Sequence, residues 1–356
     1  MRIDSDVSLA PRTTLGLGGA ARRFTIAIDE AEIVRAVREA DARGEPVLVL
    51  GRGSNLVDAD GGFDGLVVQV GSRGIEAHRE GDRVRLDVAA GEPWDPFVAR
   101  CVEDGLRGVE CLSGIPGLVG ATPIQNVGAY GQEVKGTITS VRVFDRRAGT
   151  LVDMPADSCG FTYRHSVFKG DPRFIVTRVT FVLAVSGESA PIRYAELARA
   201  LDVNEGEAAP LARTRETVIR LRRGKGMVVD PRDPDSISAG SFFVNPVMDD
   251  AAFAALQARA SARGVDAKLP RFPGDGGLHK VSAAWLIEQA GFPKGYGEGR
   301  VGISRKHALA LVNRGGATTR ELLALASTIE RGVFEAFGVS LAREPVMVGL
   351  ASDISA

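Results

Sequence analysis

The sequence of 356 residues is poor in the residues that build disulfides and metal sites. It has three cysteines, Cys101, Cys111 and Cys159, and four histidines. The odd number of cysteines and the lack of a C-x-x-C pair predict buried free thiols in a reducing compartment. The histidines are scattered along the chain, with no pair at helical spacing, so we expect no metal site.

Neither sign of charge dominates the chain. Lys and Arg number 44 and Asp and Glu number 45, which gives a net charge of -1 and no reason to expect a nucleic acid or an anionic membrane as partner. No run of eighteen apolar residues occurs, so we expect no transmembrane helix. The acidic residues among the first fourteen positions argue against a signal peptide, and we expect a cytoplasmic protein.

The length and the hydrophobic fraction of 44% are sufficient for two or three packed domains. The first half alternates helix and strand patterns. Asp29 and Glu32 predict the start of a helix, and the apolar run 47–50 predicts a buried strand. The composition changes after residue 184, which places a domain boundary between about 185 and 225. The last third predicts helices over 249–263, 281–290 and 318–337 and a strand over 308–312.

Two glycine-rich segments stand out. The first, 51-GRGSN-55, directly follows the predicted strand, and its glycines would let backbone N–H groups approach phosphate oxygens. By itself it could equally be an ordinary turn, since it matches neither the dinucleotide fingerprint nor the Walker loop. The second, 113-SGIPGLVGATPIQNVGAYGQEV-134, carries five glycines and two prolines but few charges. Because it can form neither a regular helix nor a long strand, the two segments together favour a site for an extended phosphate-bearing cofactor.

Other polar residues are ambiguous when each is taken alone. In 161-FTYRHSVFK-169, Arg164 could stabilise an anion or be a solvated surface residue. In 239-AGSFFVNP-246, Ser241 has no histidine base and no G-x-S-x-G elbow, so a proton donor fits better than a nucleophile. Lys225 could be an exposed helix end, and Glu344, just before Pro345, could be a solvated strand end.

In this order, the segments closely resemble the UDP-N-acetylenolpyruvoylglucosamine reductase family. The resemblance runs from about residue 13 to residue 349. It rests on seven motifs, namely TTLGLGG, LGRGSN, SGIPGLVGATPIQNVGAYGQE, YRHSVFK, AGSFFVNP, AAWLIEQAG and the late glutamate. Arg52 stands where a glycine is common in the family. Tyr194 resembles the tyrosine of a mobile loop in one branch of the family, so the resemblance implies membership of this tyrosine-loop branch.

The resemblance implies an α+β protein with two principal domains. Residues 1–187 would form an FAD-binding domain of the vanillyl-alcohol-oxidase type, made of two α+β subdomains that divide near residue 70. Residues 188–224 would connect the domains and carry the tyrosine loop. Residues 225–356 would form an α+β substrate-binding domain, whose last strand could return to the FAD-binding domain. A monomer is expected.

The resemblance also implies the activity, which is the NADPH-dependent reduction of UDP-N-acetylglucosamine enolpyruvate to UDP-N-acetylmuramate through FAD, in peptidoglycan precursor synthesis. Arg164 would stabilise the developing enolate, Ser241 would donate the proton and Glu344 would polarise the enol system or relay protons. The implied substrate-binding residues are Tyr163, Tyr194, Lys225, Asn245 and Gln289. The implied FAD-binding residues are Gly51, Arg52, Gly53, Ser54, Asn55, Leu56, Gly114, Ile115, Pro116, Gly117, Gly120, Ala121, Gln125, Asn126, Gly128, Ala129 and Tyr130.

Two other functions are compatible with parts of the pattern. A flavin oxidase on the same scaffold would share the glycine-rich segments, because function depends on the site and not on the fold. The combination of Arg164, Ser241 and Glu344 favours the reductase. A sugar-nucleotide binder without flavin is disfavoured because the glycine-rich segments are intact.

Overall fold

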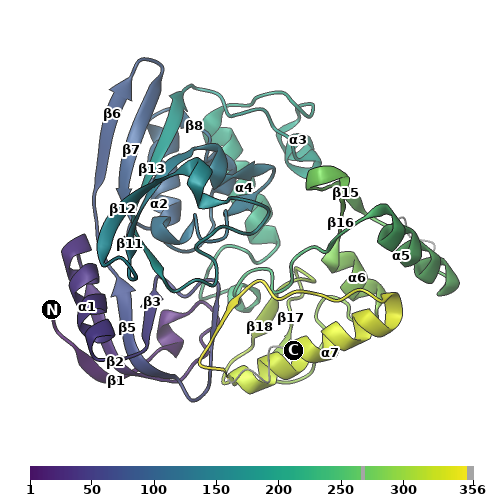
Figure 1. The fold of residues 1–356 in the computed structure, drawn as a ribbon. Helices are drawn as coiled ribbons and strands as arrows, with labels where there is room; N and C mark the ends of the chain where they lie inside the picture. Colours follow the sequence, from purple (N-terminus) through teal and green to yellow (C-terminus); the bar gives the residue numbers. More distant parts are fainter. Residues whose placement is uncertain (266–268, 351–356) are drawn as a thin grey trace. The chain divides into compact units, whose positions relative to one another are not determined.

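A computed structural model describes residues 1–265 and 269–350, which form two compact units (Figure 1). Unit 1 consists of Met1–Val7, Ala21–Arg52 and Phe63–Val228. Unit 2 consists of Ser8–Ala20, Gly53–Gly62 and the chain from Val229 onward. The chain thus passes between the units several times, and the first glycine-rich segment is divided after Arg52.

A four-stranded sheet opens unit 1. Its order is β1 (Asp4–Ser8), β2 (Ala20–Ala27), β5 (Phe63–Val70) and β3 (Val47–Leu50), and β5 pairs parallel with both β2 and β3. The helix α1 (Glu30–Ala42) packs on β5 and β3 (Figure 1). Its start is as predicted, since the Asp29 side chain accepts a hydrogen bond from the Glu32 N–H at 2.7 Å.

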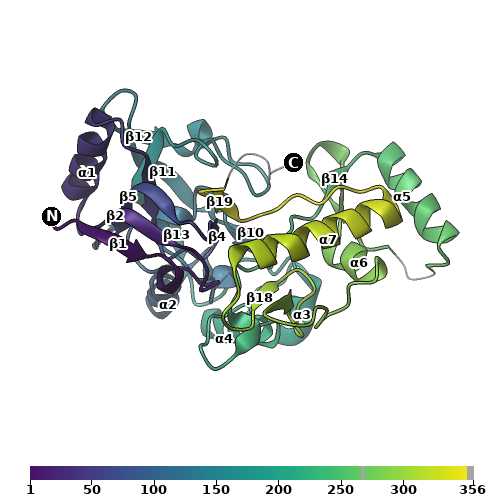
Figure 2. The ribbon, with the colours of Figure 1, turned by 90° about the horizontal axis from the view of Figure 1, so that it is seen from below.

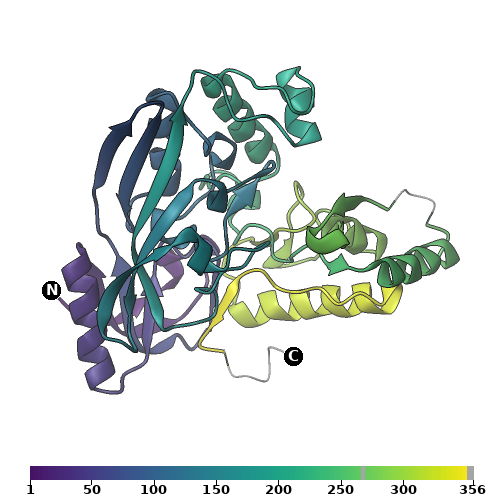
Figure 3. The ribbon, with the colours of Figure 1, turned by 45° about the horizontal axis from the view of Figure 1, so that its top comes forward.

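A larger antiparallel sheet forms the rest of the frame of unit 1, and its long strands are seen in Figure 3. The helix α2 (Trp94–Glu103) packs nearby, with Trp94 and Phe97 in contact with Phe181 at ring-centroid distances of 6.1 and 5.2 Å. This aromatic group is part of one continuous apolar core. The strands in order are β12 (Thr150–Pro155), β11 (Ile138–Asp145), β13 (Phe174–Val185), β7 (Arg83–Ala89) and β6 (Ile75–Glu80), and β8 (Leu106–Arg107) also pairs with β13.

The remainder of unit 1 is irregular or helical. The second glycine-rich segment holds only short elements, as predicted. The helices α3 (Ala195–Leu201) and α4 (Leu211–Gly224) pack together on a small core that includes Ile192, Leu197 and Val218. The short elements of unit 1 are η2 (Glu110–Leu112), η3 (Val119–Ala121), β9 (Gly128–Ala129), β10 (Gln132–Glu133), η4 (Val134–Gly136) and η5 (Ala156–Cys159).

Unit 2 is built around the long helix α7 (Thr319–Phe337), which lies against α6 (Ala283–Gln289) and the β17–β18 pair (Figure 2). Its apolar stripe is buried as predicted. The predicted strand over 308–312 is wrong in its first half, because a turn closed by the Ala310 N–H and the His307 carbonyl delays β18 (Leu311–Asn313). The other elements are η1 (Ala10–Arg12), β4 (Leu56–Asp58), η6 (Pro234–Ser236), β14 (Val247–Met248), α5 (Asp250–Ala262), β15 (Arg271–Pro273), η7 (Asp275–Gly277), β16 (His279–Val281), β17 (Val301–Ile303) and β19 (Val346–Val348).

Candidate active site

The first glycine-rich segment leaves β3 beside the second one. Within unit 1, a Cβ atom placed on Gly51 would lie 3.4 Å from Cδ1 of Leu118, so the Leu118 side chain packs against the Gly51 backbone. The Gln69 side-chain amide donates to the Gly51 carbonyl at 3.2 Å and fixes the turn. Arg52 is exposed at this point. The structure therefore brings part of both predicted cofactor segments together.

The other half of the first segment belongs to unit 2. Gly53 has a φ of +55°, and a Cβ on it would lie 2.6 Å from the Arg12 carbonyl oxygen, so only glycine fits. Leu56 begins β4, which pairs in parallel with β19. The Asn55 carbonyl accepts from the Val346 N–H at 3.0 Å, and its side-chain amide donates to the Glu344 carbonyl at 3.4 Å. A predicted cofactor residue and a predicted catalytic residue are thus hydrogen-bonded neighbours.

The second segment is accessible at its tip and at several later positions. Gly114 donates its N–H to Asp95 at 2.6 Å, and Gly120 donates to the Ala90 carbonyl at 2.9 Å, so both ends are held by the protein. The flanking residues 111–114 and 118–120 are buried, whereas Ile115, Pro116 and Gly117 are partly exposed. A ligand can therefore reach the tip of this loop. Ala121, Gln125, Gly128, Ala129 and Tyr130 are also partly exposed.

Asn126 differs from its neighbours because its side chain is completely buried. Its amide nitrogen donates to Glu133 at 2.9 Å and to the Thr162 carbonyl at 3.0 Å, and its amide oxygen accepts from the Lys135 N–H at 3.1 Å. The residue also adopts a φ of +45°. All three contacts are to the protein, so Asn126 joins the second segment to the turn that carries Tyr163 and Arg164.

Arg164 lies at that turn with a left-handed backbone, at a φ of +55°. Its guanidinium is 5.8 Å from the centre of the Tyr163 ring, and a Cβ on Gly128 would lie 3.6 Å from one of its terminal nitrogens. Lys169 donates to the Arg164 carbonyl at 3.1 Å. The arginine is therefore brought to the β9 end of the second segment and is not a fully solvated surface residue.

Two predicted substrate residues meet Tyr130 in unit 1. The Tyr194 ring packs edge-on against the Tyr130 ring at 5.3 Å, and the Lys225 ammonium lies 5.6 Å from the centre of the Tyr130 ring. Burial raises the pKa of Tyr130 to about 12, so its hydroxyl stays protonated. Tyr163, Tyr194 and Lys225 thus belong to unit 1 together with Arg164.

Ser241 and Glu344 lie on neighbouring extended segments of unit 2. Glu344 donates its N–H to the Phe242 carbonyl at 2.9 Å, and Phe242 donates to the Leu309 carbonyl at 2.7 Å. The pairing is an isolated bridge, and the side chain of Glu344 is buried. Asn245 accepts from the Ala283 N–H at 2.9 Å at the start of α6, and Gln289 is the last residue of that helix and is partly buried.

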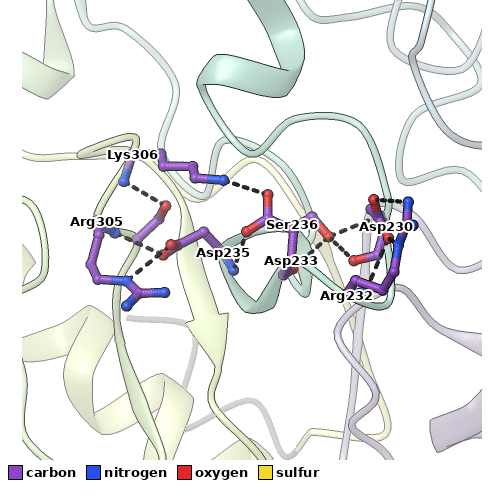
Figure 4. Close-up of polar contacts among 8 residues, drawn as sticks. Asp230, Arg232, Asp233, Asp235, Ser236, Arg305 and Lys306 are labelled. Atoms are coloured by element: carbon purple, nitrogen blue, oxygen red, sulfur yellow. Dashed lines mark hydrogen bonds and ion pairs between the residues drawn. The ribbon is translucent and has the colours of Figure 1, made fainter.

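The loop that leads to Ser241 is anchored by charged pairs (Figure 4). Asp233 pairs with Lys306 at 2.7 Å, and Asp235 accepts from the backbone N–H and guanidinium of Arg305 at 2.8 and 3.0 Å. The Ser236 hydroxyl closes the loop on itself with contacts of 2.8 Å to two of its carbonyl oxygens. These contacts fix the entry to the Ser241 segment.

Sequence reasoning missed a buried charged group beside the second segment. Burial lowers the pKa of Arg222 to about 10, and its Nε has no hydrogen-bond partner among the described residues. That nitrogen would lie 3.6 Å from a Cβ on Gly114. Asp95 nearby is already paired with Arg215 at 2.6 Å. Since α4 places Arg222 by contacts more than 100 residues away in sequence, no local pattern could have identified it.

These features fit an anionic cofactor. A buried guanidinium with an unused N–H, next to a glycine loop with an accessible tip, is suited to a phosphate-bearing group. In the part of the chain that the structure describes, no group of three or more His, Cys, Asp and Glu side chains is arranged to hold a metal ion. None of its helices is long and apolar enough to cross a membrane. All three cysteines are buried, as predicted.

Comparison with known proteins gives consistent matches over nearly the whole chain. The FAD binding domain model matches residues 21–155, and the model for the UDP-N-acetylenolpyruvoylglucosamine reductase C-terminal domain matches residues 232–348. The chain is 56% identical to the UDP-N-acetylenolpyruvoylglucosamine reductase of Streptomyces coelicolor, covering 97% of this chain and 90% of the relative. It is 55% identical to that of Thermobifida fusca, covering 97% and 98%.

A solved structure agrees with these sequence matches. The crystal structure of UDP-N-acetylenolpyruvylglucosamine reductase from Thermus caldophilus aligns with a TM-score of 0.65 at 27% identity, covering 98% of this chain and 99% of the other. The predicted fold class, an FAD-binding domain of the vanillyl-alcohol-oxidase type followed by an α+β C-terminal domain, is confirmed by these matches.

Proposed function

The chain belongs to the UDP-N-acetylenolpyruvoylglucosamine reductase family, and from this membership we propose how its own residues carry out the reaction. The protein is an FAD-dependent oxidoreductase that reduces UDP-N-acetylglucosamine enolpyruvate to UDP-N-acetylmuramate with NADPH, in peptidoglycan precursor synthesis. When bound, FAD supplies the hydride carrier between NADPH and the substrate.

The reaction adds a hydride to one carbon of the enolpyruvyl double bond and a proton to the other, so the protein must stabilise negative charge and deliver the proton. Arg164 provides a fixed positive charge for the substrate carboxylate while that charge develops. The Ser241 hydroxyl protonates C2, and the buried Glu344 carboxylate relays the replacement proton. The observation that carries this assignment is the 2.9 Å hydrogen bond from Glu344 to Phe242, which sets Glu344 beside the Ser241 segment.

The substrate is bound through its sugar nucleotide by Tyr163, Tyr194, Lys225, Asn245 and Gln289. Lys225 acts as a point charge for the diphosphate. Tyr194 closes over the substrate, which places the protein in the tyrosine-loop branch. The partial exposure of Tyr194, at 40%, and its position just before α3 support this role.

The cofactor is held by the two glycine-rich segments through the residues named above, from Gly51 to Leu56 and from Gly114 to Tyr130. Arg222 adds a buried charge for an anionic part of FAD. Asn126 holds the Tyr163–Arg164 turn in place through the protein contacts described above. The FAD-binding domain spans 1–187, the connecting segment 188–224 and the substrate-binding domain 225–356. The enzyme works in the cytoplasm as a monomer, with NADPH as its second substrate.

The two half-reactions can be tested separately. The purified protein should be yellow, should lose its colour when NADPH is added without oxygen, and should regain it when UDP-N-acetylglucosamine enolpyruvate follows. Failure of that substrate to restore the flavin absorbance would remove the reductase assignment. Fast recovery of the colour with oxygen alone would indicate a flavin oxidase.

The role of Ser241 has its own test. Ser241→Ala should leave the reduction by NADPH almost unchanged and slow the second half-reaction by roughly 10²- to 10⁴-fold, because the hydroxyl acts only on the enolpyruvyl carbon. Ser261→Ala, at an exposed position of α5 in the same unit, is the matched control and should behave as the parent protein. Normal turnover of Ser241→Ala in stopped-flow experiments would exclude Ser241 as the donor.

A further inference from the structure

We infer that Glu196 is a latch on Lys225, which occupies this lysine in the substrate-free protein and competes with the diphosphate of the sugar nucleotide. The inference rests on the proposed role of Lys225 in binding that diphosphate. Glu196 has no part in the reaction assigned above. Its function would be to set the affinity of the site for nucleoside diphosphates.

The first observation is an ion pair between residues that are distant in sequence. Lys225 Nζ lies 2.5 Å from Glu196 Oε2. Lys225 directly follows α4, and Glu196 lies in the first turn of α3. Their side chains are 32% and 33% exposed, so the pair is reachable from solvent. Exchange of a carboxylate for a phosphate at such a half-exposed lysine is easy, because the pair itself is weak and water can separate it.

The second observation is that the same pair holds two aromatic rings. Lys225 faces the Tyr130 ring at 5.6 Å, and Tyr130 packs edge-on against Tyr194 at 5.3 Å. Tyr194 is only two residues from Glu196, so the pair also ties the tyrosine to its present place. A phosphate on Lys225 would release Glu196 and, with it, the start of α3 and Tyr194. Ligand binding and movement of the tyrosine are thereby coupled through one side chain.

The charge balance explains what the latch does. With Glu196 in place, the ammonium of Lys225 is neutralised, and a weak ligand such as inorganic phosphate gains little by displacing the carboxylate. A nucleoside diphosphate carries more charge and makes further contacts, so it can displace the Glu196 carboxylate from Lys225. The latch therefore lowers the affinity for every ligand that must displace Glu196, so only a ligand with enough further contacts, such as a nucleoside diphosphate, still binds well.

The test uses the full-length holoenzyme and UDP as the probe, with binding measured by calorimetry. Glu196→Gln keeps the shape of the side chain but removes its charge, so UDP should bind about threefold to fivefold more tightly, as expected for loss of a half-exposed ion pair. Inorganic phosphate, tested in the same way, should gain by the same factor. Glu205→Gln, which removes an exposed carboxylate from the segment after α3, is the control and should not change the affinity. Glu196→Asp, which keeps the charge but shortens its reach, should also tighten binding.

A double-mutant cycle separates the latch from the role on which it rests. Lys225→Met should weaken UDP binding, and in that background Glu196→Gln should have no further effect. Unchanged affinity in Lys225→Met would overturn the assignment of Lys225 to the diphosphate. Weaker binding in Lys225→Met combined with unchanged or weaker binding in Glu196→Gln would overturn the latch alone, since Glu196 would then only orient the lysine. Thermal melting of each variant checks that it is folded.

Hydrogen exchange provides a second readout. UDP should speed amide exchange at the start of α3 in the parent protein, and Glu196→Gln should show this faster exchange without UDP. Equal exchange in the parent protein with and without UDP would contradict the coupling to Tyr194.

Discussion

The two units hold their site residues in opposite ways. In unit 1, Asn126, Tyr130 and Arg164 have left-handed backbones, with φ between +45° and +55°, and they account for three of the five non-glycine residues of this kind in the described chain. In unit 2, Ser241 and Glu344 lie on extended segments joined by ordinary backbone hydrogen bonds. A left-handed conformation costs a non-glycine residue roughly 1–2 kcal/mol, so surrounding contacts must impose it in unit 1.

The difference shows which kind of contact holds the site residues in each unit. Unit 1 fixes curved loops with buried side chains, of which Asn126 is the central one. Unit 2 fixes straight segments by pairing them with neighbours and by charged contacts at their entry. Substitutions of buried polar side chains should therefore disturb the site of unit 1 most, and those of loop ion pairs should disturb unit 2.

The largest effect on activity is expected for Arg164, which lies in the strained turn of unit 1. Arg164→Met should lower kcat by about 10²- to 10³-fold, because a preorganised positive charge near the developing anion is lost. Arg164→Lys should recover only part of the rate, since an ammonium lacks the planar two-pronged donor. Steady-state kinetics measure both, and FAD absorbance should be unchanged. Arg83→Met, at an exposed position of β7, is the control, and full activity of Arg164→Met would refute the role.

Asn126 tests whether the strain of unit 1 is imposed by hydrogen bonds. Asn126→Ala removes three contacts from a buried amide and keeps the unfavourable φ, so the free energy of unfolding should fall by about 3 kcal/mol. Urea denaturation measures the loss. Activity should fall as well, because the Thr162 carbonyl next to the Tyr163–Arg164 turn loses its donor.

The companion variant Asn126→Gly loses the same hydrogen bonds but accepts the left-handed backbone. It should be about 1 kcal/mol more stable than Asn126→Ala. If glycine were the less stable of the two, the backbone strain at this position would be unimportant, and the contrast between the units would lose its main support.

Local sequence signals were sufficient for much of this architecture. The cap at Asp29, the strand at 47–50 and the stripe of α7 depend on near neighbours, and each is found at the predicted place. The prediction that this strand is buried is wrong for Val47, Leu48 and Val49, which are partly exposed, and holds only for Leu50. The motifs also located the residues of both glycine-rich segments. The local signals could not predict which groups that are distant in sequence pair with one another. Asp95 meets Arg215 across 120 positions, and unit 2 gathers residues 8–20 and 53–62 from the start of the chain.

Asp58 should make the stability of unit 2 depend on pH. Its carboxylate is fully buried, and neither oxygen has a hydrogen-bond partner among the described residues. Burial raises its pKa from the ordinary 3.8 to about 6; the nearby N–H groups of Gly19 and Ala59 oppose this only partly, because each donates to a carbonyl oxygen. The folded protein therefore binds the proton more tightly than the unfolded chain does between pH 4 and 6.

Stability should consequently be lost as the pH rises through about 6, by roughly 2 to 3 kcal/mol in all. Asp58→Val should remove this dependence and be the more stable protein at pH 7.5, with little difference from the parent protein near pH 4. Urea denaturation at both pH values measures it. Asp64→Asn, at an exposed carboxylate, is the control. An Asp58→Val protein that is less stable at pH 7.5 would mean that the carboxylate has a stabilising partner.

The smallest effect is expected at the entry to the Ser241 segment, where Asp235 pairs with Arg305. Burial alone would raise the pKa of Asp235, but the hydrogen bonds from Arg305 outweigh it and hold this pKa below its usual value. The pair thus stabilises the fold above about pH 4 and is lost as the pH falls further, opposite in sign to Asp58. Because Arg305 is largely exposed, Asp235→Ala should lower the free energy of unfolding by only about 1–2 kcal/mol at pH 7.

The kcat of Asp235→Ala should fall more than this loss of stability suggests, since the loop positions Ser241. Arg232→Ala, which breaks an exposed pair in the same loop, should change neither quantity, and equal losses in the two variants would show that the loop is not a support for Ser241.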